Sequence, residues 1–117
     1  MSANQTAINA VDNTTNEAFF LCEIPIPNYL MAVAAGDIIY QSLGERVGVF
    51  TEPTEMPKCA SELADMGTYL NTTEAYLTPY IWGNYSILVL PPSFPMGGME
   101  NPLLTFASPT IIVGDKS

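Results

Sequence analysis

The sequence predicts an α+β fold, in which several short strands accompany a single helix. Three observations support this class. Tyr85 to Leu90 is an apolar run of strand length, and the residues from Asp37 to Phe50 show two strand-like runs around a glycine turn. Between Thr54 and Thr78, apolar residues recur at helical spacing.

The N-terminal part is predicted to contain a loop followed by two strands. Residues 1–17 are polar and are expected to form a loop. Phe19 to Ile26 has the pattern of a strand, and Pro25 and Pro27 place it at an edge or a bend, because proline cannot donate a ladder hydrogen bond. The apolar run from Tyr29 to Ala35 is short and has β-branched and aromatic flanks, which favours a buried strand over a helix.

A hairpin and a helix are predicted next. The hairpin covers Asp37 to Phe50 and turns at residues 43–45. The helix begins near Thr54, a candidate cap, tolerates Pro57 in its first turn and ends at Thr78. Its apolar face consists of Cys59, Leu63, Met66, Leu70 and Leu77. Glu74 lies on this helix, and loss of its charge by Glu74→Gln is expected to have little effect on any catalytic turnover.

Three strands are predicted in the C-terminal part. Tyr85 to Leu90 has the pattern of a buried strand, which Pro91 ends. Leu103 to Ala107 and Thr110 to Val113 have the pattern of two further short strands.

Length and charge restrict the classes of function. The 117 residues have the length of one domain at most. The net charge of −9 disfavours binding to nucleic acids or to anionic membranes, since both carry negative charge themselves. The three basic residues, Arg46, Lys58 and Lys116, are too scattered to form a phosphate-binding patch.

Histidine is absent, so the chain lacks the commonest general base and the commonest zinc ligand. Cys22 and Cys59 match no metal-binding spacing and are interpreted as small buried hydrophobic residues in a reducing compartment, with a disulfide between them as the alternative. No secretory leader is recognisable, and the longest apolar stretch, residues 29–36, is too short to span a bilayer. A cytoplasmic protein is expected.

The segment Gly97, Gly98, Met99, Glu100 and Asn101 is the candidate functional motif. Composition alone favours a glycine turn between two strands, with Glu100 simply solvated. The order of the residues indicates more, because it matches the Gly-x-Met-Glu-Asn motif. In this respect the chain resembles the gluzincin aminopeptidases.

The flanking residues are similar to the branch of that family that contains leukotriene A-4 hydrolase and aminopeptidase B. The segments that carry the similarity are residues 80–85, 88–95, 101–106, 108–110 and 114–117. Residues 24–30 and 1–3 are similar to the end of that family's N-terminal β-domain, and the resemblance is weak over 1–23 and 51–79. Met96 departs from the pattern, because an aromatic residue usually precedes the glycine pair in this branch. In the family, this position bears on the shape of the pocket for the first substrate residue.

The resemblance implies a role for each part of the motif. The carboxylate of Glu100 would bind the free α-ammonium group of a peptide substrate, a charge-assisted contact that restricts cleavage to the N-terminus. Gly97 and Gly98 would let the backbone approach the substrate and offer N–H groups to its carbonyl. The strand after the motif would lie along the extended substrate.

The resemblance also implies an incomplete enzyme. Family members carry His-Glu-x-x-His and a distal glutamate shortly after the segment at 114–117, and these residues hold zinc and activate its water. None of them occurs here, so no residue is assigned to catalysis or to a metal, and zinc is the cofactor of the full-length family only. Tyr80 and Tyr85 are expected to be packing residues. Residues 1–36 would end an N-terminal β-saddle domain, and residues 37–117 would begin a thermolysin-like catalytic domain.

The functional prediction is therefore a fragment of a zinc aminopeptidase that binds peptide N-termini and is not catalytic alone. Its partners would be the peptide and the remainder of the catalytic domain. Two alternatives stay open: a non-catalytic module that captures peptide N-termini, and a non-functional truncated product.

Overall fold

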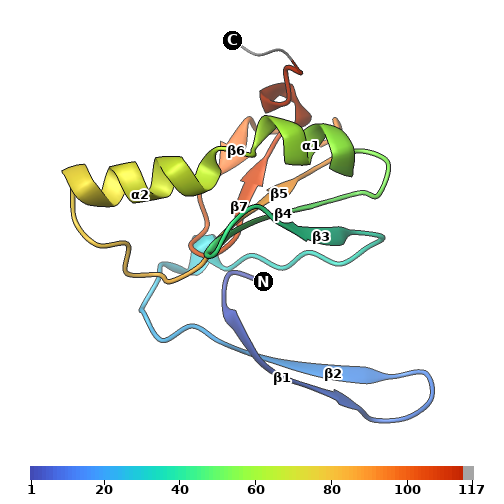
Figure 1. Ribbon diagram of the computed structural model, residues 1–117. Helices are drawn as coiled ribbons and strands as arrows, with labels where there is room; N and C mark the ends of the chain where they lie inside the picture. The colour runs from blue at the N-terminus through green and yellow to red at the C-terminus, as the bar shows by residue number, and fades with distance from the viewer. Residues whose placement is uncertain (115–117) are drawn as a thin grey trace.

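The computed structural model describes residues 1–114 and contains two separate sheets (Figure 1). The first is an antiparallel pair, and the second has five strands in the order β3-β4-β5-β7-β6. In the second sheet β4, β5 and β7 run parallel, whereas β3 and β6 run antiparallel to their neighbours at the two edges. The strands are β1 Asn4–Ala10, β2 Asn16–Leu21, β3 Ile39–Ser42, β4 Val47–Thr51, β5 Tyr85–Val89, β6 Gly98–Met99 and β7 Thr105–Ala107.

Helices complete the α+β fold, which confirms the predicted class. They are α1 Met56–Glu62 and α2 Met66–Tyr76, together with the 3-10 helices η1 Asn28–Leu30 and η2 Pro109–Ile111. Helices α1 and α2 lie over one side of the five-stranded sheet (Figure 1). The core lies between them and that face of the sheet. It is formed by Val47, Val49, Ile87, Val89 and Ala107 from the strands and by Met56, Cys59 and Met66 from the helices.

The N-terminal predictions were wrong in two places. Residues 1–17 are not a loop, because β1 pairs with β2 and gives their backbone groups partners. The turn between the strands is closed by Asp12, whose carboxylate accepts hydrogen bonds from the backbone N–H and the hydroxyl of Thr14 at 2.7 and 2.8 Å. Strand β2 also begins and ends earlier than expected.

The second error concerns Tyr29 to Ala35, which forms η1 and an irregular segment rather than a buried strand. Tyr29, Met31 and Val33 are exposed, and Ala32 alone is fully buried. The backbone of Ala32 pairs with Ser2, whose N–H donates to the Ala32 carbonyl at 3.0 Å and whose hydroxyl accepts from the Ala32 N–H at 2.9 Å. Hydrogen bonds to the single residue Ser2 do not make a strand of this segment.

The predicted hairpin and the strand after Tyr85 are confirmed as β3–β4 and β5. The predicted single helix is two helices, separated at residues 63–65. Pro57 lies in the first turn as expected, but Thr54 makes no capping hydrogen bond. Periodicity could not reveal the break, since Cys59 and Met66 reach the core in either arrangement.

The predicted strand from Thr110 to Val113 was also wrong, because η2 occupies this region. Ser108 caps η2 by accepting a hydrogen bond from the N–H of Thr110, and Pro109 begins it. Both features favour a helical turn over a strand. Within residues 1–114, no helix is long and apolar enough to cross a membrane; the cytoplasmic location stays a prediction.

Candidate functional site

The glycine-rich motif lies at one edge of the five-stranded sheet. Gly98 and Met99 form β6 and pair with Ala107 and Phe106 of β7. The N–H of Ser108 donates to the Gly97 carbonyl at 3.0 Å, which extends this pairing by one residue. The other side of β6 has no neighbouring strand among the described residues. The motif therefore presents an unpaired backbone edge.

The two glycines differ in what requires them. Neither has a backbone in the left-handed region. At Gly98, an added Cβ would come within 3.1 Å of the Phe106 carbonyl oxygen, so close packing against β7 explains this glycine. At Gly97, an added Cβ would meet no described atom within 4 Å. Neither conformation nor packing within residues 1–114 accounts for glycine at position 97.

Glu100 and Asn101 have opposite environments. The side chain of Glu100 is exposed at the end of β6, and it forms no ion pair with the described residues. Asn101 is 2% exposed, and its amide N–H₂ donates to the carbonyls of Met99 at 3.4 Å and Leu104 at 3.3 Å. The backbone N–H of Asn101 also donates to the Met99 carbonyl at 2.9 Å. Asn101 thus fixes the turn from inside and leaves the carboxylate of Glu100 free.

The expectation for the strand after the motif was wrong. Strand β7 lies between β5 and β6, so both of its edges are already paired. An extended peptide could not add to it. At this end of the sheet the available edge belongs to β6, which is the motif itself.

The residues present do not fit a zinc site. The sequence has no histidine, and residues 1–114 contain no group of three or more His, Cys, Asp or Glu side chains placed to hold a metal ion. Both cysteines are free thiols: Cys59 is buried and Cys22 is half-buried. Asp115, Lys116 and Ser117, which contribute to the family resemblance, lie outside the described residues.

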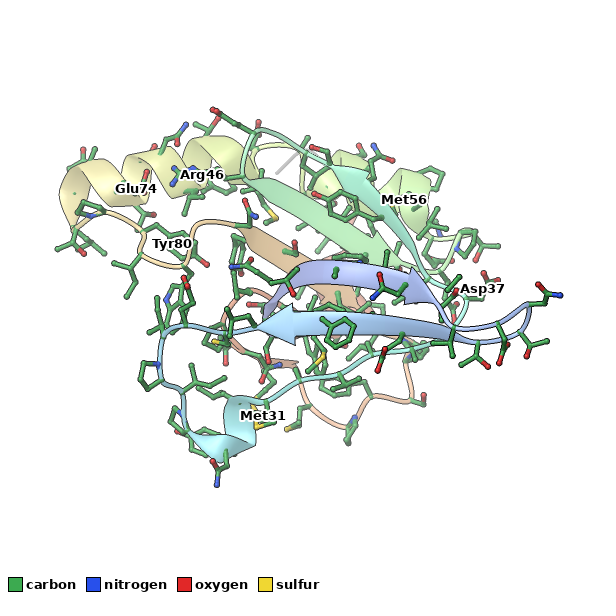
Figure 2. The ribbon with its side chains drawn as sticks, turned by 90° about the horizontal axis from the view of Figure 1, so that it is seen from below. Met31, Asp37, Arg46, Met56, Glu74 and Tyr80 are labelled. Atoms are coloured by element: carbon green, nitrogen blue, oxygen red, sulfur yellow. The ribbon has the colours of Figure 1, made fainter. Side chains whose placement is uncertain are left out.

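A polar cluster that the sequence did not predict joins the β3–β4 turn to α2 and to the segment before β5. Arg46 donates to both carboxylate oxygens of Glu74, at 3.0 and 2.6 Å, and to the side-chain oxygen of Asn71 at 3.2 Å. The N–H of Tyr80 donates to the same carboxylate at 2.8 Å. Figure 2 shows Arg46, Glu74 and Tyr80 together at this corner of the molecule.

This cluster gives Glu74 partners that its place on the predicted helix did not indicate. The hydrogen bonds from Arg46 and Tyr80 lower the pKa of Glu74 from 4.5 to about 2. Burial raises the pKa of Tyr80 to about 12, and its ring packs edge-on against Tyr85 with the ring centroids 6.2 Å apart. The packing role expected for these tyrosines is confirmed. Arg46 and Glu74 are 28 residues apart, so no local pattern could reveal their pairing.

Comparisons with known proteins agree on one group. The family described as peptidase family M1 domain matches residues 62–117. Leucine aminopeptidase 2 of Pyricularia oryzae is 54% identical over 94 residues, which cover 80% of this chain and 15% of that protein. Its namesake in Yarrowia lipolytica is 47% identical over 105 residues, covering 89% of this chain and 16% of that protein.

The structure of native yeast LTA4 hydrolase superposes with a TM-score of 0.85 at 38% sequence identity, covering 99% of this chain and 18% of that one. The two sheets and the helices are therefore arranged as in that structure. The chain spans about 15% of the length of the curated relatives that it matches.

Proposed function

The chain belongs to the M1 peptidase family, among the gluzincin aminopeptidases that resemble leukotriene A4 hydrolase, and from this premise we propose that it supplies the segment that binds the free α-ammonium group of a peptide. The family is zinc-dependent in general, and its aminopeptidases act on peptides. In the proposal, Glu100 is the residue that recognises the amine.

One observation supports this role above the others: the carboxylate of Glu100 is exposed at the end of an edge strand, on a turn that the buried Asn101 fixes. A carboxylate on such a fixed turn, with no competing partner among the described residues, can accept charge-assisted hydrogen bonds from an ammonium group. A peptide with a blocked N-terminus has no such charge. The site would then select substrates by their free amine.

The unpaired edge of β6 supports the other half of the proposal. An extended peptide can add to such an edge through backbone hydrogen bonds, with its first residue next to Glu100. The space around Gly97 allows a ligand backbone to come close, which a side chain at this position would hinder. Gly97, Gly98 and Met99 would thus bind the peptide backbone, and Asn101 would hold the motif in place.

The proposal assigns no chemical step to this chain. With no histidine and no metal-binding group among residues 1–114, the zinc ligands and the general base of the reaction would come from the remainder of the peptidase. Residues 1–36 would be the end of an N-terminal β-domain, and residues 37–117 would be the start of the catalytic domain. The chain is not catalytic by itself in this proposal.

The proposal is tested by grafting residues 1–117 in place of the matching segment of yeast LTA4 hydrolase, whose fold they share. Glu100→Gln keeps the size of the side chain but removes its charge. Aminopeptidase kcat/KM should fall by at least ~100-fold, because loss of one charged partner in a desolvated site costs about 2–5 kcal/mol.

Glu17→Gln is the matched control, since Glu17 is exposed on β2, in the sheet that does not contain the motif. Its turnover should stay within ~2-fold of the unsubstituted graft. Glu74 cannot serve as the control because it is paired with Arg46. Equal turnover for Glu100→Gln and Glu17→Gln would refute the proposal.

A further inference from the structure

The turn that follows Glu100 has an unusual backbone. The N–H of Leu104 donates to the Asn101 carbonyl at 3.2 Å, so residues 101–104 form a β-turn with Pro102 and Leu103 at its centre. Leu103 has a φ of 68°, and it is the one residue other than glycine with a positive φ in residues 1–114. Turns with a positive φ at the second central position normally carry glycine or asparagine there, because a side chain at that position is strained.

Burial on several sides keeps this strained turn in place. Leu103 is 8% exposed and lines a cavity of about 250 Å³ between the two sheets. Met1 and Phe20 of the N-terminal part line the same cavity, together with Leu88 of β5. On the inner side, the amide of Asn101 reaches across the turn to the Leu104 carbonyl. Leu103 and its neighbour Leu104 are therefore the residues through which the turn meets the space between the two sheets, and Leu103 is the one with the left-handed backbone.

We propose that Leu103 is a positioning residue for the amine site. Its buried side chain holds the left-handed backbone of the turn at residues 101–104, which follows Glu100 directly. This turn sets the direction in which the carboxylate of Glu100 leaves the sheet. The N-terminal sheet then supports the substrate site without touching the substrate. This inference rests on the proposed function, because it assigns Leu103 an effect exerted through Glu100.

Two substitutions of similar volume test the role in the grafted enzyme. Leu103→Met keeps a side chain of similar size that is not branched at Cβ, and it should leave KM and kcat within ~2-fold of the parent. Leu103→Ile is β-branched, which a positive φ disfavours, so it should raise KM about tenfold with kcat nearly unchanged. Leu103→Gly allows the left-handed backbone but removes the buried side chain, and it should also raise KM. Normal KM in the folded Ile or Gly variant would overturn the proposal.

A double-mutant cycle separates positioning from a general structural role. In the Glu100→Gln background, Leu103→Ile should cause almost no further loss of kcat/KM, because the group that it positions is already lost. Fully additive losses would overturn the role of Leu103 while leaving that of Glu100 intact. If Glu100→Gln alone has no effect, the proposed function fails, and this inference fails with it.

The conformation itself can be checked in the 117-residue chain by NMR. A positive φ brings the amide and α protons of Leu103 close together, so a strong cross-peak between them is expected. A weak cross-peak would show that the turn is not left-handed, and the proposal would fall on structural grounds alone.

Discussion

Both sheets carry apolar side chains, but those side chains have opposite environments. In β1 and β2 nearly every residue is exposed, including Ile8, Phe19 and Leu21. In β4 and β5 nearly every residue is buried or half-buried. The difference lies in the covering layer: α1 and α2 pack on the five-stranded sheet, whereas no described helix packs on the pair (Figure 1). A strand's apolar content therefore allows burial but does not produce it.

Leucine-to-alanine substitutions in the two sheets should show the largest contrast, measured as the loss in the free energy of unfolding. Leu88 in β5 is 1% exposed, and Leu21 in β2 is 52% exposed. Leu88→Ala should lower the free energy of unfolding by about 2–5 kcal/mol, because it leaves a cavity in the core. Leu21→Ala should cost less than ~1 kcal/mol. Urea unfolding followed by circular dichroism measures both values, and equal losses would mean that the hairpin is buried in solution.

One carboxylate with a lowered pKa lies on α2, beside the five-stranded sheet, and another lies in the β1–β2 turn, which allows a comparison by pH. The hydrogen bonds from Arg46 and Tyr80 lower the pKa of Glu74 to about 2, and those from Thr14 lower the pKa of Asp12 in the β1–β2 turn. A lowered pKa contributes stability that is complete above the unfolded value and is lost as the pH falls through the folded value.

The urea concentration at the unfolding midpoint should therefore decrease as the pH is lowered from about 5 to about 2. Glu74→Gln should flatten this dependence more than Asp12→Asn, because its partner is a charged guanidinium that joins three segments. Urea midpoints measured at several pH values test the order. A larger effect of Asp12→Asn would show that the ion pair between Arg46 and Glu74 does not form.

The smallest contrast concerns the two thiols. Burial raises the pKa of Cys59, which lies on α1 and faces the core, whereas Cys22 in the N-terminal part is half-buried. Cys59 should react with a thiol reagent at neutral pH at least ~10-fold more slowly than Cys22, because little thiolate is present and access is blocked. The two rates should converge in urea. Equal rates in the native chain would mean that α1 does not stay on the sheet.

Prediction from sequence succeeded where the signal was local. The hairpin of β3 and β4 was found because turn residues separate two strand-like runs, and β5 was found because its apolar run has strand length and ends at prolines. It failed at β1, whose polar residues gain a strand only through their pairing with β2. It also failed at η2, where the capping by Ser108 outweighed the strand-like residues that follow.

The candidate site divides in the same way. Its residues were found from the order Gly-Gly-Met-Glu-Asn, and the comparisons confirm the family that this order indicated. Their environment was not predicted. Strand β6 is an edge strand because it pairs with a segment that follows it in sequence, and the left-handed position of the next turn holds Leu103 instead of the usual glycine or asparagine. The pairing of Arg46 with Glu74 spans 28 residues and leaves no local trace.

By itself, the sequence determined the fold class, the family and the position of the carboxylate that is proposed to bind the amine, because each of these depends on neighbouring residues in a recognisable order. Only the tertiary structure decided which strand is an edge, which apolar side chains are covered, and how Glu100 is held at the surface while Asn101 and Leu103 are buried. These properties arise from contacts between distant segments. Such contacts depend on which surfaces meet after folding, and composition and periodicity do not record this.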